Sequence, residues 1–217
     1  MLTLYTYFRS SAAFRMRIAL HYKGLSYDPQ YVSLVKAEHL GADYAKLNPQ
    51  GLVPTLIDGE HLLNQSMAMI EYLDEAHPGP KLVPGEALQR WRIRSLAQLI
   101  ACEIHPINNL RILKYLKSSL NHTPEEIDVW YRHWCAEGLG AYERELSVGT
   151  TQTLRPGQYS VGDQVSLADV CLVPQIFNAK RFNVDTAALP KTMAIFERLM
   201  KLPSFESSQP SKQADAF

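Results

Sequence analysis

The chain has 217 residues, of which 46% are hydrophobic, so it can form one large domain or two small ones with buried cores. Lys and Arg number 22, as do Asp and Glu, which gives a formal net charge of zero. Because a neutral chain has no long-range field that attracts nucleic acid or an anionic membrane, we expect neither as a partner. A local basic site for a small anion remains compatible with this balance.

The N-terminal region predicts the element order β-α-β-α-β-β-α. Residues 2–7 alternate in polarity and are rich in β-branched and aromatic side chains, which is typical of a strand. An amphipathic helix follows, with Phe14, Ile18 and Tyr22 at helical spacing and a serine near its N-cap. Since a helix connects them, the next strand should run parallel to the first. The remaining elements are expected at 27–34 (strand), 39–47 (helix), 53–57 and 62–63 (strands) and 66–76 (helix).

The C-terminal region predicts helices almost throughout, after Pro/Gly breaks at 78–80 and 84–85. Residues 87–118 form one helix, or two joined near Pro106. A helix is expected at 124–146 with Thr123 as its N-cap, and another from Ser166 onward, where Ser166 and Asp169 resemble a capping box. A last helix is expected at 189–201, and the polar tail from Pro203 is expected to lie extended. We therefore expect an α/β domain over residues 1–80 and an all-α domain over residues 87–217.

Three widely spaced cysteines, with no CxxC pair, predict reduced thiols and no metal site. The N-terminus lacks the basic segment and apolar core of a signal peptide, and no apolar run has transmembrane length. These observations predict a soluble, cytoplasmic protein.

Arg9-Ser10-Ser11 is the first candidate site, because a strand ends and a helix begins there. The first N–H groups of a helix have no internal partners, and the helix dipole is positive at that end. Together with a donating hydroxyl, they lower the pKa of a thiol. In the alternative interpretation, the two serines only cap the helix.

Two further segments could bind an extended peptide ligand. A cis bond at Val53-Pro54 would leave the backbone of Val53 available for strand-like pairing. Gln65-Ser66 begins a helix, where N–H groups and polar side chains suit a carboxylate. An edge-strand proline and an ordinary serine N-cap are the structural alternatives.

A fourth polar cluster surrounds Pro106 inside the predicted long helix. Proline bends a helix, so His105 and Asn109 could face a cleft. In the alternative interpretation, these polar residues lie at a helix kink that is exposed to solvent.

These motifs resemble the cytosolic glutathione transferases, and in detail the zeta class, whose members include maleylacetoacetate isomerases. The resemblance spans almost the whole chain. It is carried by Tyr7-Phe8-Arg9-Ser10-Ser11, Leu47-Asn48-Pro49, Val53-Pro54-Thr55-Leu56, Gln65-Ser66, Ile104 to Leu110, Leu167-Ala168-Asp169, Asn178-Ala179 and Arg181-Phe182. It implies the glutathione transferase fold, with an N-terminal thioredoxin-like domain and an all-α C-terminal domain, usually in a homodimer.

The resemblance also implies roles for particular residues. Ser10 would donate to the glutathione sulfur, with Ser11 beside it, and Arg9 and Arg181 would bind the carboxylates of the substrate. The remaining contacts to glutathione would come from His39, Val53, Gln65, Ser66, His105, Asn109 and Arg111.

The implied activity is glutathione-dependent cis–trans isomerisation of a maleyl dicarboxylate, with maleylacetoacetate becoming fumarylacetoacetate in aromatic amino acid catabolism. Ala12 stands where many zeta-class enzymes have Cys, so the thiol chemistry would rest on the cofactor alone. The alternatives are a maleylpyruvate isomerase of gentisate degradation, a general zeta-class transferase, or a non-catalytic glutathione-binding protein.

Overall fold

The computed structural model describes residues 1–148 and 154–217, which form two compact units. The first comprises Met1–Leu82 together with Lys201–Phe217, and the second comprises Val83–Met200. The C-terminal segment, which is predicted to belong to the helical domain of 87–217, packs instead with the first unit. In the described ranges, no helix is long and apolar enough to cross a membrane.

The first unit contains a four-stranded sheet in the order β2-β1-β3-β4. β1 pairs in parallel with β2, and antiparallel pairs join β1 to β3 and β3 to β4. This confirms the predicted strands and the parallel first pair, although β2 is shorter than predicted. The strands are β1 (Leu2–Thr6), β2 (Tyr27–Tyr31), β3 (Thr55–Asp58) and β4 (His61–Asn64).

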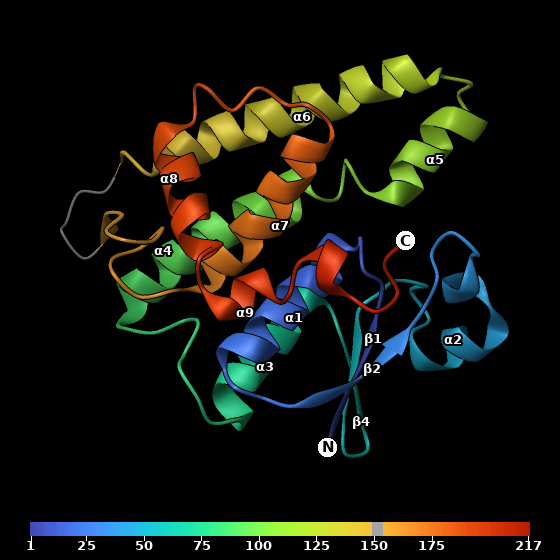
Figure 1. The fold of residues 1–217 in the computed structure, drawn as a ribbon, viewed down its shortest axis with the longest axis horizontal. Helices are drawn as coiled ribbons and strands as arrows, with labels where there is room; N and C mark the ends of the chain where they lie inside the picture. The colour runs from blue at the N-terminus through green and yellow to red at the C-terminus, as the bar shows by residue number, and fades with distance from the viewer. Residues whose placement is uncertain (149–153) are drawn as a thin grey trace. The chain divides into compact units, whose positions relative to one another are not determined.

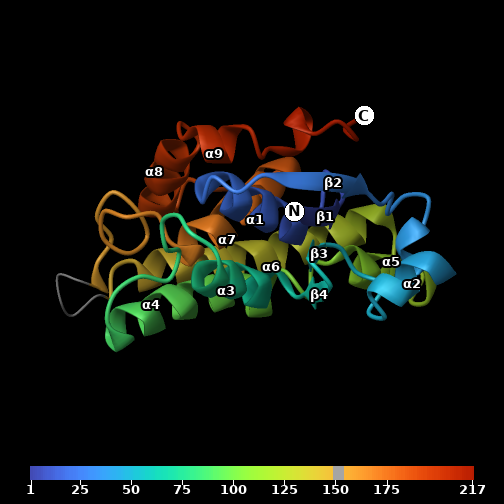
Figure 2. The same cartoon turned by 90° about the horizontal axis from the view of Figure 1, so that it is seen from below.

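The helices of the first unit include α1 (Ser11–Tyr22), α3 (Ser66–Ala76) and the short α9 (Pro203–Glu206). α1 lies between α3 and α9 (Figures 1 and 2). The predicted helix at 39–47 is a 3₁₀ turn at Glu38–Leu40 followed by α2 (Ala42–Leu47).

The core of this unit follows from the alternation predicted for β1, whose residues Leu2, Leu4 and Thr6 are buried. The C-terminal end of α1 is tied to α3 by the buried Lys23 ammonium, which lies 3.2 Å from a carboxylate oxygen of Asp74. The largest fully buried side chains of the unit are Arg17, Phe14, Phe205, Leu4, Met16, Ile18, Leu20, Leu56, Met69, Ile70 and Leu73.

The prediction that the tail is extended was wrong. Besides α9, the tail forms a 3₁₀ turn at Pro210–Lys212, and the Phe205 side chain is completely buried. Pro203 at the first position of α9 has the φ angle that a helix requires. One buried aromatic residue in a polar segment produces no periodic pattern, so only tertiary packing explains this turn of helix.

The described part of the second unit is mostly helical. α4 contacts α7, α7 contacts α8, and α5 contacts α6, the long helix near the top of Figure 1. The elements are α4 (Ala87–Gln98), a π-helical turn (Leu99–Ile104), α5 (Leu110–Ser118), α6 (Pro124–Glu145), α7 (Leu167–Arg181) and α8 (Pro190–Leu199). The interruption after Ile104 confirms the two-helix alternative for residues 87–118. All three cysteines are free thiols in helical segments, as expected.

Two helices in this unit begin with the predicted capping residues. Thr123 and Glu126 form a reciprocal capping box at α6, and Ser166 and Asp169 form another at α7. The Asp169 carboxylate is fully buried and accepts hydrogen bonds from Ser160 N at 2.9 Å, Ser166 N at 2.8 Å and Ser166 Oγ at 2.9 Å. Burial raises the pKa of Asp169, whereas these hydrogen bonds lower it.

Candidate active site

Ser10 occupies the N-cap of α1. Its extended backbone (φ −69°, ψ 119°) lets the Oγ atom accept the Ala13 N–H at 3.2 Å. Accepting this bond leaves the hydroxyl proton of Ser10 available for donation. Ser10 is half-buried, and Ser11 is buried as the first residue of the helix. Ser10 Oγ therefore caps the helix, and its hydroxyl group can still donate a hydrogen bond to a thiolate.

Arg9 projects from the loop that precedes this cap. It is exposed, and its Cζ atom lies 4.7 Å from the ring centroid of Phe8 and 4.9 Å from that of Phe217. The two rings also contact each other edge to face, with centroids 5.1 Å apart. Cation–π contacts of this kind restrict the guanidinium while leaving its N–H edge able to bind an anion.

Three hydrogen bonds, two of them buried, hold the same loop in place. The Phe8 N–H donates to Asp215 Oδ2 at 3.0 Å, and Arg17 donates to the carbonyl oxygens of Tyr7 and Phe8 at 3.3 and 3.0 Å. Burial lowers the pKa of Arg17 to about 10, which leaves it protonated at neutral pH. Sequence reasoning missed Asp215, Arg17 and Phe217, because no local pattern connects the tail with residues 7–9.

Val53 lies two residues before β3, whose pairing with β1 begins at Thr55. The Val53–Pro54 peptide bond is cis, and Val53 is buried. The preceding loop is fixed by Asn48 Nδ2 and Tyr44 Oη, which donate to the Leu52 carbonyl at 2.8 and 2.7 Å. The backbone of Val53 thus has a defined position at the end of the ladder.

Gln65 and Ser66 form the predicted helix start, at the N-terminus of α3. Gln65 has φ 66°, an uncommon value for a residue other than glycine, which costs about 1–3 kcal/mol. Its Nε2 donates to Gln50 Oε1 at 2.7 Å, and the buried Ser66 Oγ accepts from Arg15 Nη1 at 3.4 Å. Strained backbone of this kind is often found where a ligand binds.

His39 is buried in the 3₁₀ turn before α2, beside the loop that contains Gly51. Gly51 has φ +59°, and a Cβ added there would lie 3.3 Å from the carbonyl oxygen of His39. Within the first unit, Arg15 therefore connects Ser66 to α1, and Gln50 connects Gln65 to the 48–52 loop. The same loop lies beside His39.

Residues 105–109 of the second unit form turns between the π-helical segment and α5. The His105 N–H donates to the Ile100 carbonyl at 3.0 Å, and Asn109 is the N-cap of α5, accepting the Arg111 N–H at 3.1 Å. Both predicted residues therefore also have structural roles. Arg111 is exposed.

Arg181 ends α7 and is also exposed. Its Cζ atom lies 4.7 Å from the Phe182 ring centroid, and that ring stacks on Tyr131 with centroids 3.6 Å apart. As at Arg9, an aromatic ring supports an exposed guanidinium. This arrangement suits bidentate binding of a carboxylate.

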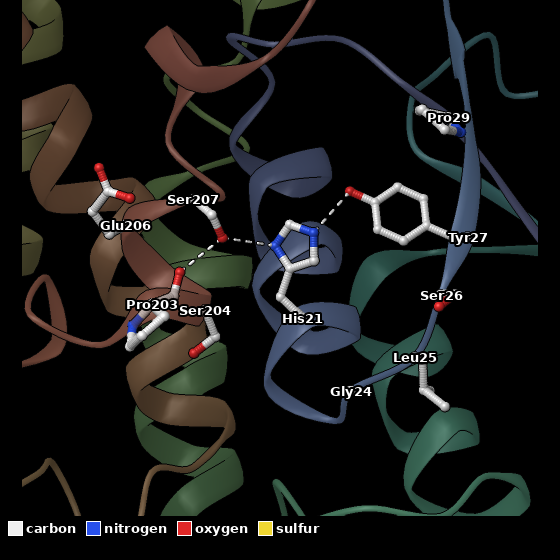
Figure 3. Close-up of a pocket in the computed structure, with 10 residues that line it drawn as sticks. All are labelled: His21, Gly24, Leu25, Ser26, Tyr27, Pro29, Pro203, Ser204, Glu206 and Ser207. Carbon is white, nitrogen blue, oxygen red and sulfur yellow. Dashed lines mark hydrogen bonds between the residues drawn. The ribbon is translucent and has the colours of Figure 1, made fainter.

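A hollow of about 680 Å³ lies at the other end of α1, and none of the predicted site residues lines it (Figure 3). The Nδ1 atom of His21 lies 2.8 Å from Ser208 Oγ and 3.2 Å from Ser207 Oγ. Both hydroxyls donate to backbone carbonyls, so Nδ1 carries the proton, and Nε2 faces Tyr27 Oη at 3.5 Å. The residues of the hollow therefore secure α9 against α1.

The fold and these helix-terminal sites define a glutathione transferase. Residues 4–81 match the family model for the glutathione S-transferase N-terminal domain, and residues 136–203 match that for the C-terminal domain. The chain belongs to the zeta class of glutathione S-transferases, the family of the maleylacetoacetate isomerases.

Particular relatives are similar over their full lengths. The chain is 48% identical to a probable maleylacetoacetate isomerase of Vibrio cholerae, covering 99% of this chain and 98% of the relative. A holo structure of a bacterial zeta-class maleylpyruvate isomerase is 42% identical, with a TM-score of 0.95 and coverage of 99% and 100%. The maleylacetoacetate isomerase of Methylobacterium extorquens AM1, solved with malonate and glutathione, is 36% identical, with a TM-score of 0.94 and coverage of 99% of each chain.

Proposed function

We propose that this protein is a glutathione-dependent cis–trans isomerase that converts maleylacetoacetate to fumarylacetoacetate. The observation that carries the proposal is the Ser10 hydroxyl at the N-terminus of α1, directly after the exposed Arg9. A hydroxyl donor and a helix N-terminus stabilise a thiolate, and an exposed guanidinium binds a carboxylate. The zeta-class relatives named as maleylacetoacetate isomerases support the same activity.

The donors of the first unit fit glutathione. Ser10, with Ser11 beside it, would hold the sulfur, and the backbone of Val53 would pair with the tripeptide. Gln65 and Ser66 at the start of α3 would hold the γ-glutamyl carboxylate, since their N–H groups lie at a helix terminus. His39, His105, Asn109 and Arg111 are proposed to complete the contacts.

Bound glutathione supplies a thiolate that adds reversibly to the cis double bond, permits rotation about the resulting single bond, and is released as the trans double bond forms. Ser10 would keep the sulfur ionised by donating a hydrogen bond from its hydroxyl group to the thiolate. Arg9 and Arg181 bind the substrate carboxylates, and Arg9 stabilises the negative charge that develops on the conjugated carbonyl oxygen. No protein thiol is required, which is consistent with Ala12 at this position.

Maleylpyruvate is the second candidate substrate. The zeta-class maleylpyruvate isomerase matches this chain with a TM-score of 0.95 and 42% identity. Both substrates present a maleyl double bond beside a carbonyl group and two carboxylates, so the same residues would serve either one.

The experiment is retention on immobilised glutathione, followed by absorbance assays with maleylacetoacetate and maleylpyruvate at equal concentrations. We expect specific elution by free glutathione, and turnover that requires glutathione without consuming it. Turnover of maleylpyruvate alone would identify the second candidate. A protein that binds glutathione but isomerises neither compound would contradict both.

Assembly and location complete the proposal. Leu88 and Trp91 lie one turn apart on α4 and are 56% and 55% exposed, which supports burial of this helix face in a homodimer. Sedimentation of the wild type and of Trp91→Glu tests the proposed homodimer, and a monomeric wild type would contradict it.

Three free thiols and a thiol cofactor suit the reducing cytoplasm. Maleylacetoacetate as the main substrate implies a role in aromatic amino acid catabolism.

A further inference from the structure

Arg15 is a buried cation whose hydrogen bonds are incomplete. It lies one turn after Ser11 on α1, and only 2% of the residue is exposed. Nη1 donates to Ser66 Oγ at 3.4 Å. Nε and Nη2 are buried and have no hydrogen-bond partner among residues 1–148 and 154–217.

Arg17, two positions later on the same helix, provides the contrast. It is 1% exposed, and all three of its side-chain nitrogens donate to oxygen atoms. Arg17 therefore has the hydrogen bonding expected of a structural arginine. Arg15 does not, and burying a charged group without partners is costly. A buried guanidinium with free donors is suited to an anion that arrives from outside the protein.

Ser66 connects Arg15 to the N-terminus of α3. Because Ser66 Oγ accepts the Arg15 bond, its own proton can be donated to a ligand. The first N–H groups of this eleven-residue helix lie beside the hydroxyl and have no intrahelical acceptors. The hydroxyl, the N–H groups and the buried positive charge all favour a carboxylate at this point.

We infer that Arg15 is a positioning residue that acts through Ser66 to select the carboxylate at the γ-glutamyl end of glutathione. This inference rests on the proposed function, since it assumes that glutathione binds here. The positive charge polarises the Ser66 hydroxyl towards donation and favours a charged ligand over a neutral one of the same shape. Arg15 therefore determines which ligand binds and has no part in the chemistry of the thiol.

The test compares two ligands by titration calorimetry, so that it does not depend on turnover. One is glutathione, and the other is 4-aminobutyryl-cysteinyl-glycine, which lacks only the γ-glutamyl carboxylate. We expect Arg15→Met to weaken glutathione binding by about 10- to 100-fold, as for loss of a charge-assisted hydrogen bond. The same variant should change the Kd of the analogue less than about twofold, because the missing carboxylate is the group that Arg15 favours.

Lys23→Met is the matched control. Lys23 is also a buried cation with a partner on α3, but it lies at the opposite end of α1, as the C-cap residue. This variant should lower the melting temperature while preserving the ratio of the two dissociation constants. Arg15→Lys, which keeps the charge, should recover part of the preference for glutathione, and it replaces Arg15→Met if that variant does not fold.

The outcomes separate the inference from the proposed function. Equal weakening of both ligands by the Arg15 variants, or no weakening of either, would overturn the role of Arg15 while leaving glutathione binding intact. Failure of the wild type to bind either ligand would instead overturn the proposed function itself.

Discussion

Substitutions at Ser10 can separate its structural role as a helix cap from its proposed role as a donor to the glutathione thiolate. Ser10→Ala removes both the acceptor for the Ala13 N–H and the donated proton. Ser10→Gly also removes the hydroxyl, but glycine is a better N-cap than alanine. Ser10→Thr keeps the hydroxyl and the cap.

The two roles predict different magnitudes. Loss of the cap should reduce the free energy of unfolding by about 1 kcal/mol in Ser10→Ala and by a few tenths of that in Ser10→Gly. Loss of one hydrogen bond to a charged sulfur removes about 1.5–3 kcal/mol of thiolate stabilisation. At about 1.4 kcal/mol per pKa unit, the pKa of bound glutathione should rise by about 1–2 units in both variants.

The assay is the pH dependence of turnover and of the ultraviolet absorbance of the bound thiolate. Near neutral pH, Ser10→Ala and Ser10→Gly should lose about 10- to 100-fold in turnover, because a smaller fraction of the thiol is ionised. The loss should shrink as the pH approaches the raised pKa of the thiol, and Ser10→Thr should behave nearly as the wild type. The same series at Ser11 would show which hydroxyl is the donor.

Two results would refute this reasoning. Unchanged turnover of Ser10→Gly at neutral pH would mean that Ser10 is only a cap. A loss that stays constant across the whole pH range would mean that the hydroxyl positions the sulfur without changing its ionisation.

Three further predictions concern other parts of the chain. Arg181→Ala should raise the KM for the maleyl substrate about tenfold or more while leaving the Kd for glutathione unchanged; a loss confined to glutathione binding would contradict the assigned role. Asp169→Ala should lower the free energy of unfolding by about 3 kcal/mol, because buried donors lose their acceptor, and urea denaturation should show this loss; a change within measurement error would mean that the buried capping box contributes nothing. Burial, and then the Arg17 cation, lower the pKa of His21, so the unfolded chain binds the proton more readily than the folded one. The stability from His21 should thus be complete above pH about 6.5 and decline as the pH falls below it, and His21→Gln should remove this dependence from denaturation curves at pH 7.5 and 5.5. Parallel pH dependence in the wild type and His21→Gln would show that another group is responsible.

Local signals in the sequence were sufficient for most elements. The alternation in residues 2–7 and the serine at position 10 identified β1 and the start of α1, and Thr123 and Ser166 identified the starts of α6 and α7. Such signals depend on contacts within a few residues, so they can be recognised without knowing the fold. The tail has no equivalent pattern, and its helical turn was missed for that reason.

The candidate site divides in the same way. Its serines could be found from the sequence because each lies where a helix starts. The free N–H groups at a helix N-terminus favour an anion in any surroundings. The fully bonded Arg17 and the partly bonded Arg15 could not be told apart, since both are arginines in one apolar helix.

The sequence by itself determined the order of strands and helices, the capped helix termini and the family to which the chain belongs. Only the tertiary structure decided that Asp215 accepts the Phe8 N–H across 207 positions, and that a buried guanidinium lies beside Ser66. Capping depends on neighbours in the chain, whereas these contacts depend on which surfaces are buried together. No local pattern encodes such burial, so the environment of each charged group appears only when the chain is folded.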